Sequence, residues 1–541
     1  MPSITKRTAR PGRAGPVPAP ASRTLARAAA ALLPALFAFA LYLPSLGNPL
    51  VWDDDFHLPL ARKMTVAETF GNAGGEYRRP VVLLSYMGQW KVGMASAAEL
   101  HAVNVLLHGA NSLLLALLLL RMGLPASVAG AAALVFAVHP LQSGSAAYIS
   151  GRTDLLAAAF TLLALLLVAQ GPDQDKHSRR GAPTGDHPFR ELAAALACAA
   201  CVALAALSKE IGLAAGPLVA LFAYFQLRRG RHPSPLLPIA ALVTCVCCAL
   251  LVMPPAATAG GLSLSLRLRA VGTAAATYTQ LLVWPVGLHL DRLSPTRGHQ
   301  AIFTALTLTG LAAAVVIRFV RTPTLVGLGL VSALVLYLPG SGFIPVSPAI
   351  AERFIFTPEQ FLYLPLAPLC ALLAAALHRY GGHPATLVGA CLLALLSVPS
   401  VLAHQRDFAG DERLYRSTLK YSPSPRACFN LGRLQLDTQR YQEAASTYKR
   451  CVDFSPGDAG AHGQLAIAYQ KLGRAAEARA SYLRATELDD DNPLLWSNFA
   501  TLDANEARYG DARTKWQRAL AIDPAFAPAQ AALAKLEQAT K

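Results

Sequence analysis

Long blocks of apolar residues, rich in Ala, Leu and Val, recur along the first three quarters of the chain, with short polar segments between them. Each block has roughly 17 to 22 residues, and about 20 residues of α-helix cross the hydrocarbon core of a membrane. The pattern therefore predicts an all-α, polytopic membrane protein with about 11 transmembrane helices. The predicted spans are residues 28–46, 102–120, 127–147, 155–170, 191–207, 211–227, 236–254, 301–317, 323–340, 361–377 and 385–403.

Basic residues set the expected orientation, because short cytoplasmic loops of membrane proteins are enriched in Lys and Arg. The basic segment 1–27 is expected to be cytoplasmic, and an odd number of spans puts the C-terminal region on the other side. The predicted cytoplasmic loops are basic, as in "RRGRH" at 228–232. The run Asp53 to Asp55 and the "SKE" turn at 208–210 then lie on the non-cytoplasmic face. The first apolar block is longer than the core of a cleavable signal peptide, which favours a retained anchor.

The net charge of +16 comes largely from basic residues that border the predicted spans. Membrane lipid explains them, so no nucleic acid partner is expected. Seven of the nine cysteines lie in apolar spans, where Cys behaves as a small hydrophobe. Cys428 and Cys451 lie in the polar C-terminal region. They could pair in an oxidising compartment, but their spacing alone does not decide this.

From about residue 411 the pattern becomes that of a soluble helical region with an internal repeat. The segments "ACFNLGRLQL", "AHGQLAIAYQ", "LWSNFATLDA" and "AQAALAKLEQ" begin at 427, 461, 495 and 529, a period of 34 residues. Small and aromatic residues recur in register, and this pattern resembles the tetratricopeptide repeat. Residues 411–541 are thus expected to form an α-solenoid of three repeats and a final helix. Such solenoids bind peptide or protein partners; the alternative is that this one only stabilises or oligomerises the membrane region.

Polar motifs end several predicted spans on the non-cytoplasmic face. In chain order they are "VWDD", "YRRP", "HAVNVLLH", "FAVHP", "GRTDLLA", "SKE", "WPVGLHLD" and "YLP". Followed by the repeats, this set resembles the transmembrane and tetratricopeptide-repeat-containing O-mannosyltransferases and their bacterial relatives, which are GT-C type glycosyltransferases. The resemblance implies that residues 28–404 form a GT-C-like transmembrane domain. It also implies transfer of a mannose-like sugar from a polyprenyl-phosphate donor to an acceptor, expected to be a protein hydroxyl.

Asp53 and Asp54 follow the first span, where a lipid-linked donor and an aqueous acceptor would meet. Glycosyl transfer needs a carboxylate that takes the proton of the acceptor hydroxyl as its oxygen attacks the anomeric carbon. Either Asp is therefore a candidate catalytic base, whereas Asp55 is expected to keep the loop hydrated and His57 to be a bystander. The alternative is that the whole Asp run only keeps this loop in water.

The phosphate of the donor becomes the leaving group, so basic side chains on this face are candidate phosphate ligands. These are Arg152, Lys209, Arg353, Arg78 and Arg79, each of which could instead anchor lipid headgroups. Candidates for a supporting role are Asp154, Glu210, His139, Asp291 and Glu352. Asp154 and Glu210 could hold the cations in place or bind a metal, and a requirement for Mg²⁺ or Mn²⁺ stays open.

Two departures from the family pattern bear on donor binding. Gly144 stands where an acidic residue usually follows the "HP" motif, and the "YLP" signal can be read at Tyr363 or as "ERFIFTP" from Glu352. The rival functions are a non-catalytic membrane scaffold for envelope or secretory assembly, and a transferase that acts on lipid or glycan. The Ala- and Arg-rich composition favours a bacterial inner membrane with periplasmic repeats over an endoplasmic reticulum membrane.

Overall fold

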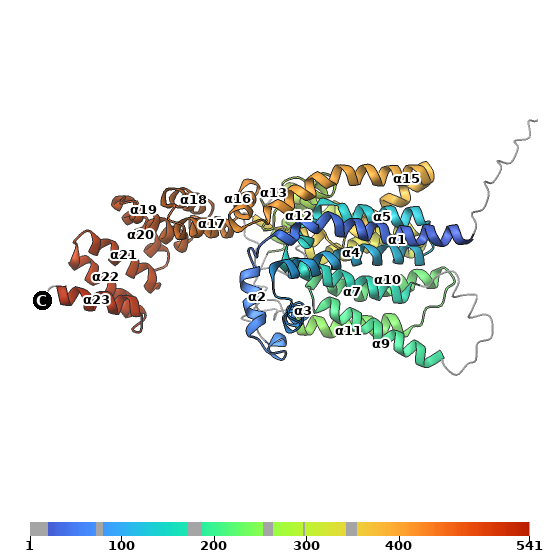
Figure 1. Ribbon diagram of the computed structural model, residues 1–541, viewed down its shortest axis with the longest axis horizontal. Helices are drawn as coiled ribbons and strands as arrows, with labels where there is room; N and C mark the ends of the chain where they lie inside the picture. Colours follow the sequence, from blue (N-terminus) through green and yellow to red (C-terminus); the bar gives the residue numbers. More distant parts are fainter. Residues whose placement is uncertain are drawn as a thin grey trace, which may run out of the picture.

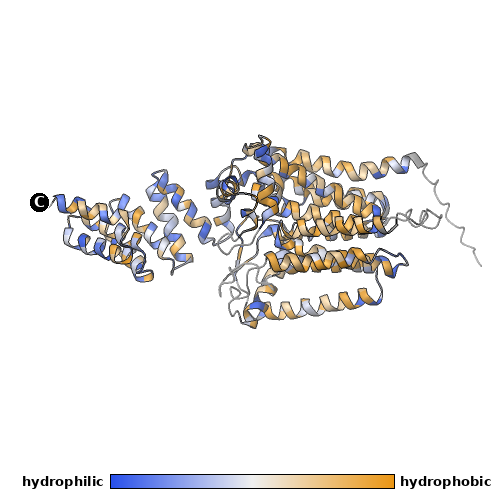
Figure 2. Ribbon diagram, turned by 90° about the horizontal axis from the view of Figure 1, so that it is seen from below, coloured by the Kyte–Doolittle hydropathy of each residue, from blue (hydrophilic) through white to orange (hydrophobic). Residues whose placement is uncertain are grey.

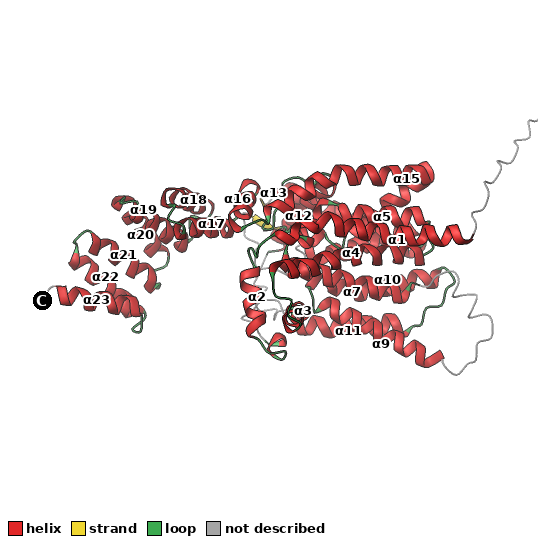
Figure 3. Ribbon diagram, in the orientation of Figure 1, coloured by secondary structure: helices red, strands yellow, loops and turns green. Residues whose placement is uncertain are grey.

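The computed structural model describes residues 20–71, 79–169, 187–252, 263–295, 298–341 and 354–539. Figure 1 shows two regions: a bundle of long helices, and an array of shorter paired helices that projects from one end of the bundle. Nearly all of the described chain is helical (Figure 3). The predicted all-α architecture is confirmed.

The bundle is built from helices of very different lengths. They are α1 (Pro20–Tyr42), α2 (Asp54–Lys63), α3 (Pro80–Lys91), α4 (Ala97–Arg121), α5 (Ala126–Val138), α6 (Ser143–Ala146), α7 (Arg152–Val168), α9 (His187–Ala206), α10 (Ala215–Arg228), α11 (Leu236–Val252), α12 (Leu264–Val283), α13 (Gly298–Arg321), α14 (Leu325–Tyr337) and α15 (Leu366–Asp407). A short antiparallel ribbon of β1 (Leu293–Pro295) and β2 (Phe354–Phe356) lies between them in sequence. The hydrophobic pattern gave no sign of this ribbon.

The bundle helices are apolar over most of their surface, whereas the helices of the array alternate apolar and polar positions (Figure 2). The described residues include seven helices that are long and apolar enough to cross a membrane, or up to eight if α5 and α6 count as one bent span. Two shorter apolar helices, Leu236–Leu251 and Leu325–Gly340, accompany them. The chain is therefore an all-α membrane protein with a helical array attached.

Each of the predicted spans falls on one of these apolar helices, and the lower number has physical reasons. α11 and α14 are shorter than a usual span. The spans predicted at 361–377 and 385–403 lie on the two sides of Gly382, whose φ of 70° is not helical and breaks the 42-residue element α15. The two predicted spans are therefore separate helices, although α15 counts once among the seven. α5 and α6 bend by 57° at Pro140, because proline lacks the N–H that would continue the helix.

Close helix packing in the bundle depends on small residues. At Gly272 of α12, an added Cβ would lie 1.9 Å from the backbone oxygen of Ala301 in α13. Only glycine allows this approach, so the two backbones pack directly against each other. Small residues at such positions are typical of helix contacts inside membranes, where the hydrophobic effect gives little help.

The array consists of α16 (Asp411–Tyr421), α17 (Pro425–Asp437), α18 (Tyr441–Phe454), α19 (Ala459–Lys471), α20 (Ala475–Leu488), α21 (Pro493–Asn505), α22 (Tyr509–Ile522) and α23 (Ala527–Ala539). From α17 to α22 the helices form three consecutive antiparallel pairs. The in-register aromatics Tyr448, Tyr482 and Trp516 are buried, as the repeat predicts. An added Cβ at Gly432 would lie 2.6 Å from the Tyr448 ring, which explains the small residue in this register position.

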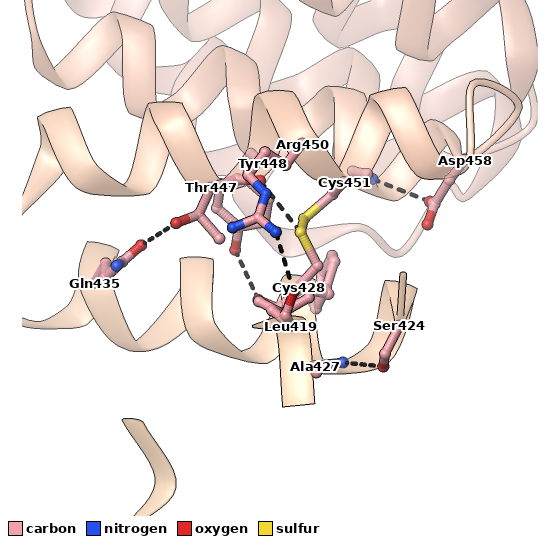
Figure 4. Close-up of a disulfide and its surroundings, with 12 residues drawn as sticks. Leu419, Ser424, Ala427, Cys428, Gln435, Thr447, Tyr448, Arg450, Cys451 and Asp458 are labelled. Carbon is pink, nitrogen blue, oxygen red and sulfur yellow. Dashed lines mark hydrogen bonds between the residues drawn. A yellow bond between two sulfur atoms is a disulfide. The ribbon is translucent and has the colours of Figure 1, made fainter. Parts of the chain in front are cut away.

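A disulfide joins the two helices of the first pair. The sequence left open whether Cys428 and Cys451 are bonded, and the structure shows that they are. Cys428 of α17 and Cys451 of α18 are bonded, with their Cα atoms 5.6 Å apart (Figure 4). Beside it, the Thr447 hydroxyl donates to Gln435 at 2.7 Å and the Arg450 guanidinium donates to the backbone oxygen of Leu419 at 3.2 Å. The last contact ties the first pair to α16.

Reduction of this disulfide is expected to destabilise the array. The bond closes a loop with a sequence separation of 23 residues, for which the loss of unfolded-state entropy corresponds to about 3 kcal/mol. Thermal unfolding of the purified protein with and without dithiothreitol measures the effect. The double variant Cys428→Ala/Cys451→Ala should unfold earlier than wild type and should not respond to the reductant. An unfolding curve of wild type that ignores the reductant would contradict the prediction.

Candidate functional site

The loops predicted to be non-cytoplasmic meet at the end of the bundle that carries the array. α2, α3 and α16 all lie there, whereas α1 begins at the opposite end (Figure 1). At that opposite end, Arg228 donates to the backbone oxygens of Val320 at 2.9 Å and Arg321 at 3.3 Å, which joins two loops predicted to be cytoplasmic. This grouping agrees with the predicted orientation, which itself stays a prediction.

Asp54 is the first residue of α2 and is fully buried. Its Oδ2 accepts a hydrogen bond from the backbone N–H of Val51 at 3.2 Å. Its Oδ1 accepts from both the backbone N–H and the hydroxyl of Ser150, at 2.9 Å and 2.7 Å. Asp54 therefore fastens the Asp loop to the segment between α6 and α7, and both of its oxygens are engaged.

Because Asp54 is buried, its titration makes the stability of the folded protein depend on pH. Removal from water raises the pKa of Asp54 from 3.8 to about 7, although the bonds from Ser150 and Val51 oppose the rise. Between these two values the unfolded chain has lost the proton while the folded protein still binds it. Stability contributed by this group therefore falls as the pH rises through the window and changes no further above it.

The variant Asp54→Asn isolates this effect, because its side chain does not titrate. We expect the melting temperature of wild type minus that of Asp54→Asn to decrease from about pH 4 to about pH 7 and then to level off. Thermal unfolding of both proteins in the same detergent across this range measures the difference. A difference that stays constant with pH would contradict the prediction, whatever its absolute size.

Asp53 is more accessible than Asp54 and contacts the array. Its side chain is 29% exposed, and its Oδ1 pairs with the Arg426 guanidinium at the start of α17. Its backbone N–H donates to the Tyr148 hydroxyl at 3.1 Å. The preceding Trp52 has a left-handed φ of 58° and donates its backbone N–H to Asp411 at 3.0 Å. Asp53 thus sits on a constrained turn between the bundle and the array.

Two ion pairs lie side by side in the same end of the bundle. Lys209 donates to both carboxylate oxygens of Asp154 at 2.8 Å, and both side chains are buried. The neighbouring Glu210 accepts from Arg79 at 3.2 Å, and the Arg79 side chain is 32% exposed. Of the predicted cation and carboxylate candidates, these four are brought together in complementary pairs. The acidic members hold the basic ones, as the sequence suggested in one of its alternatives.

Arg152 is placed differently from the other basic candidates. It is fully buried, and its guanidinium donates to Asn104 at 2.8 Å, to the backbone oxygen of Leu100 at 2.8 Å and to Gln89. It also lies over the Tyr86 ring, 4.4 Å from its centroid. Arg152 and these neutral partners hold α3, α4 and α7 together, and contact of Arg152 with a phosphate stays a prediction.

Of the other predicted site residues, Asp291 lies near enough to Asp53 and Arg426 for their charges to act on it. Arg78, Arg353 and Glu352 lie outside the described residues. His139 stands at the bend between α5 and α6, and its Nδ1 accepts from the backbone N–H of Leu141 at 3.3 Å. Asp291 pairs through Oδ2 with the hydroxyl of Ser424, and burial raises its pKa. Within the described ranges, no group of three or more His, Cys, Asp or Glu residues could hold a metal ion.

A further buried cluster was not predicted from the sequence. Glu359 accepts from the backbone N–H of His289 at 2.9 Å and pairs with Arg292, and burial raises the pKa of Glu359 to about 7. The cluster joins the "WPVGLHLD" and "YLP" segments. Both segments stood out as motifs, but a separation of 67 residues between Glu359 and Arg292 left no local signal of their pairing.

Comparison with known proteins agrees with an all-α membrane protein that ends in tetratricopeptide repeats. Residues 435–498 match the family model of the tetratricopeptide repeat. The chain is 23% identical over 521 residues to the protein O-mannosyl-transferase TMTC3 of Mus musculus, and 23% identical over 513 residues to that of Homo sapiens. Each match covers 83% of this chain and 54% of the relative. The predicted family resemblance is confirmed, and the chain spans about half the length of the curated relatives it matches.

Two further matches cover smaller parts of the chain. The BBSome complex member BBS4 of Xenopus tropicalis is 35% identical over 81 residues, which is 15% of this chain and 16% of that protein. Among solved structures, the first TPR of Spaghetti (RPAP3) bound to the HSP90 peptide SRMEEVD is 22% identical, with a TM-score of 0.21. It covers 21% of this chain and 92% of that one.

Proposed function

We propose that this protein is a membrane glycosyltransferase that moves a mannose-like sugar from a polyprenyl-phosphate donor to a hydroxyl of a protein acceptor. The observation that carries the proposal is the accessible carboxylate of Asp53, held beside Asp54 at the end of an apolar bundle. The similarity to proteins named protein O-mannosyl-transferases over 83% of the chain supports the same activity.

In this reaction Asp53 acts as the general base. The acceptor oxygen forms a bond to the anomeric carbon of the sugar while the bond from that carbon to the phosphate oxygen breaks. The proton of the hydroxyl passes to the Asp53 carboxylate, and the polyprenyl phosphate leaves with the electron pair. Asp54 supports the reaction indirectly, because its bonds to Ser150 and Val51 fix the loop that carries Asp53.

Arg79 is the described cation best suited to the donor phosphate. Its side chain is partly exposed, and its Nε is buried without a hydrogen-bond partner among the described residues. A phosphate oxygen would satisfy this N–H and would be stabilised by the charge as it leaves. Lys209 precedes Glu210, the partner of Arg79. Because Lys209 is buried and bound by Asp154, its role is to stabilise the local arrangement.

The reaction is placed on the non-cytoplasmic face, with segment 1–27 in the cytoplasm and the repeats on the side of the site. The basic loops at the opposite end of the bundle support this orientation. The repeats then present a protein acceptor close to Asp53, and a bacterial inner membrane with periplasmic repeats is the setting that the composition favours. Residues 28–404 act as the transferase domain and residues 411–541 as the acceptor-binding domain.

Transfer from a panel of labelled polyprenyl-phosphate sugars tests this function. The purified protein in lipid nanodiscs is given each donor and a mixture of Ser- and Thr-containing peptides, and labelled peptide is measured. Label transferred from a mannose donor is expected. Transfer to lipid or free glycan alone would overturn the protein acceptor. No transfer from any donor, by protein whose repeats still capture a binding partner, would favour the membrane scaffold.

A further inference from the structure

The array contributes a side chain to the candidate site. Arg426, at the start of α17, pairs with Oδ1 of Asp53 across a sequence separation of 373 residues. The same guanidinium lies over the Trp52 ring, 4.9 Å from its centroid. Oδ2 of Asp53 has no hydrogen-bond partner among the described residues. Arg426 therefore holds one oxygen of the carboxylate and leaves the other without a hydrogen bond among the described residues.

Contacts on both sides hold this pair in place. On the side of α16, Asp411 accepts from the backbone N–H of Trp52, and the Tyr415 ring packs against the Trp52 ring with their centroids 5.4 Å apart. On the other side, the Ser424 hydroxyl donates to the Asp291 carboxylate. Ser424, two residues before Arg426, is fully buried. The start of α17 is thus fixed against the bundle from two directions.

Global stability alone does not account for the contact between Arg426 and Asp53. The two side chains are 55% and 29% exposed, and an ion pair with this exposure typically contributes less than about 1 kcal/mol. The turn beneath it is nonetheless strained, because Trp52 holds a left-handed φ of 58° that non-glycine residues rarely adopt. Such strain is characteristic of sites where a side chain must be aimed.

We propose that Arg426 is a positioning residue for Asp53, so that the docked repeat array forms part of the site in addition to binding a partner. This inference rests on the proposed function, in which Asp53 is the base. Arg426 restricts the rotation of the Asp53 carboxylate and keeps Oδ2 directed to the acceptor hydroxyl. The array and the bundle must then be docked for the transfer step to proceed.

Steady-state kinetics of full-length variants test the positioning role. Arg426→Ala is expected to lower kcat by about 10- to 100-fold with little change in the KM for the donor, since a small misplacement of a catalytic group has effects of this size. Arg426→Lys, which keeps a cation at this position, should recover most of the rate. The matched control is Arg433→Ala, an exposed arginine of the same helix. A lower melting temperature for Arg426→Ala with unchanged kcat would overturn the proposal.

A second measurement does not depend on turnover. Trypsin can cut within α16 at Arg413, Arg416 and Lys420, and its rate reports release of the array from the bundle. Cleavage is compared for Asp53→Ala, Arg426→Ala and the double variant. The cleavage rate of the double variant should differ by at least about threefold from the rate that the two single effects would give if they were independent, as expected for contacting residues.

The two measurements separate the possible failures. Additive effects on cleavage would overturn the role of Arg426 even if the protein transfers sugar. Coupled effects without transfer from any donor would overturn the proposed function, and with it the catalytic purpose of the pair, while supporting the docking contact itself.

Discussion

Replacement of Asp53 by Asn is expected to lower the rate of sugar transfer by about 1,000-fold, the usual range for loss of a general base. The amide has nearly the same size as the carboxylate and can still accept a hydrogen bond from Arg426, but it cannot take the proton of the acceptor hydroxyl. Folding should be preserved, because the pair that Asp53 makes is partly exposed. Transfer of label from the donor to an acceptor peptide, normalised to folded protein, measures the effect.

Asp54→Asn in the same assay identifies the base. The buried position of Asp54, with both oxygens bound, predicts that its variant loses stability and retains more activity per folded molecule than Asp53→Asn. Full transfer by Asp53→Asn would contradict the assignment. If Asp54→Asn folded normally and were the inactive variant, the proton acceptor would be Asp54.

Replacement of Asp154 by Ala is expected to destabilise the membrane region by about 3 to 5 kcal/mol. The reason is that the amino group of Lys209 would lose its carboxylate partner, in a site where its side chain is only 4% exposed. The Phe361 ring, whose centroid lies 5.0 Å from Nζ, compensates only part of this loss. Thermal unfolding in detergent, followed by size-exclusion chromatography, measures the change.

The double variant Asp154→Leu/Lys209→Met is the control. It removes both charges and fills a similar volume with apolar side chains, so it should unfold much closer to wild type than Asp154→Ala does. If the double variant were as unstable as Asp154→Ala, the loss of stability would have a cause other than the unpaired Lys209. Arg79→Ala leaves Glu210, which is 5% exposed, without its partner. The effect should be smaller, because the removed Arg79 side chain is 32% exposed and its space opens to water that can hydrate Glu210.

The fold could be predicted from the sequence because its signals are local. Each apolar block is long enough to define a helix by itself, and the 34-residue period marks the repeats through residues such as Gly432 and Tyr448 that contact each other within one unit. The break at Gly382 falls between two predicted spans, where the polar segment at 378–383 already marks it. The bend at Pro140 falls inside one predicted span, and hydrophobicity alone does not report it.

The site was predictable only in part, because its contacts join distant segments. The pairing of Lys209 with Asp154 could be suggested from the charges of two neighbouring loops. The contacts of Asp53 with Arg426 and of Asp54 with Ser150 span 373 and 96 residues, and no pattern in a single sequence marks them. Arg152 shows the opposite case: a basic residue at the end of a predicted span suggests a phosphate ligand, yet neutral partners surround its guanidinium.

The distance in sequence between Asp53 and Arg426 also sets an order of assembly. A ribosome adds roughly 5 to 20 residues per second, so about 20 to 75 seconds separate the synthesis of the two residues. During that interval the first loop has already crossed to the far side of the membrane in the proposed topology, and the later spans are still being inserted. Asp53 and Asp54 are the first acidic residues to be made, and the pair that contains Asp53 is among the last contacts to form.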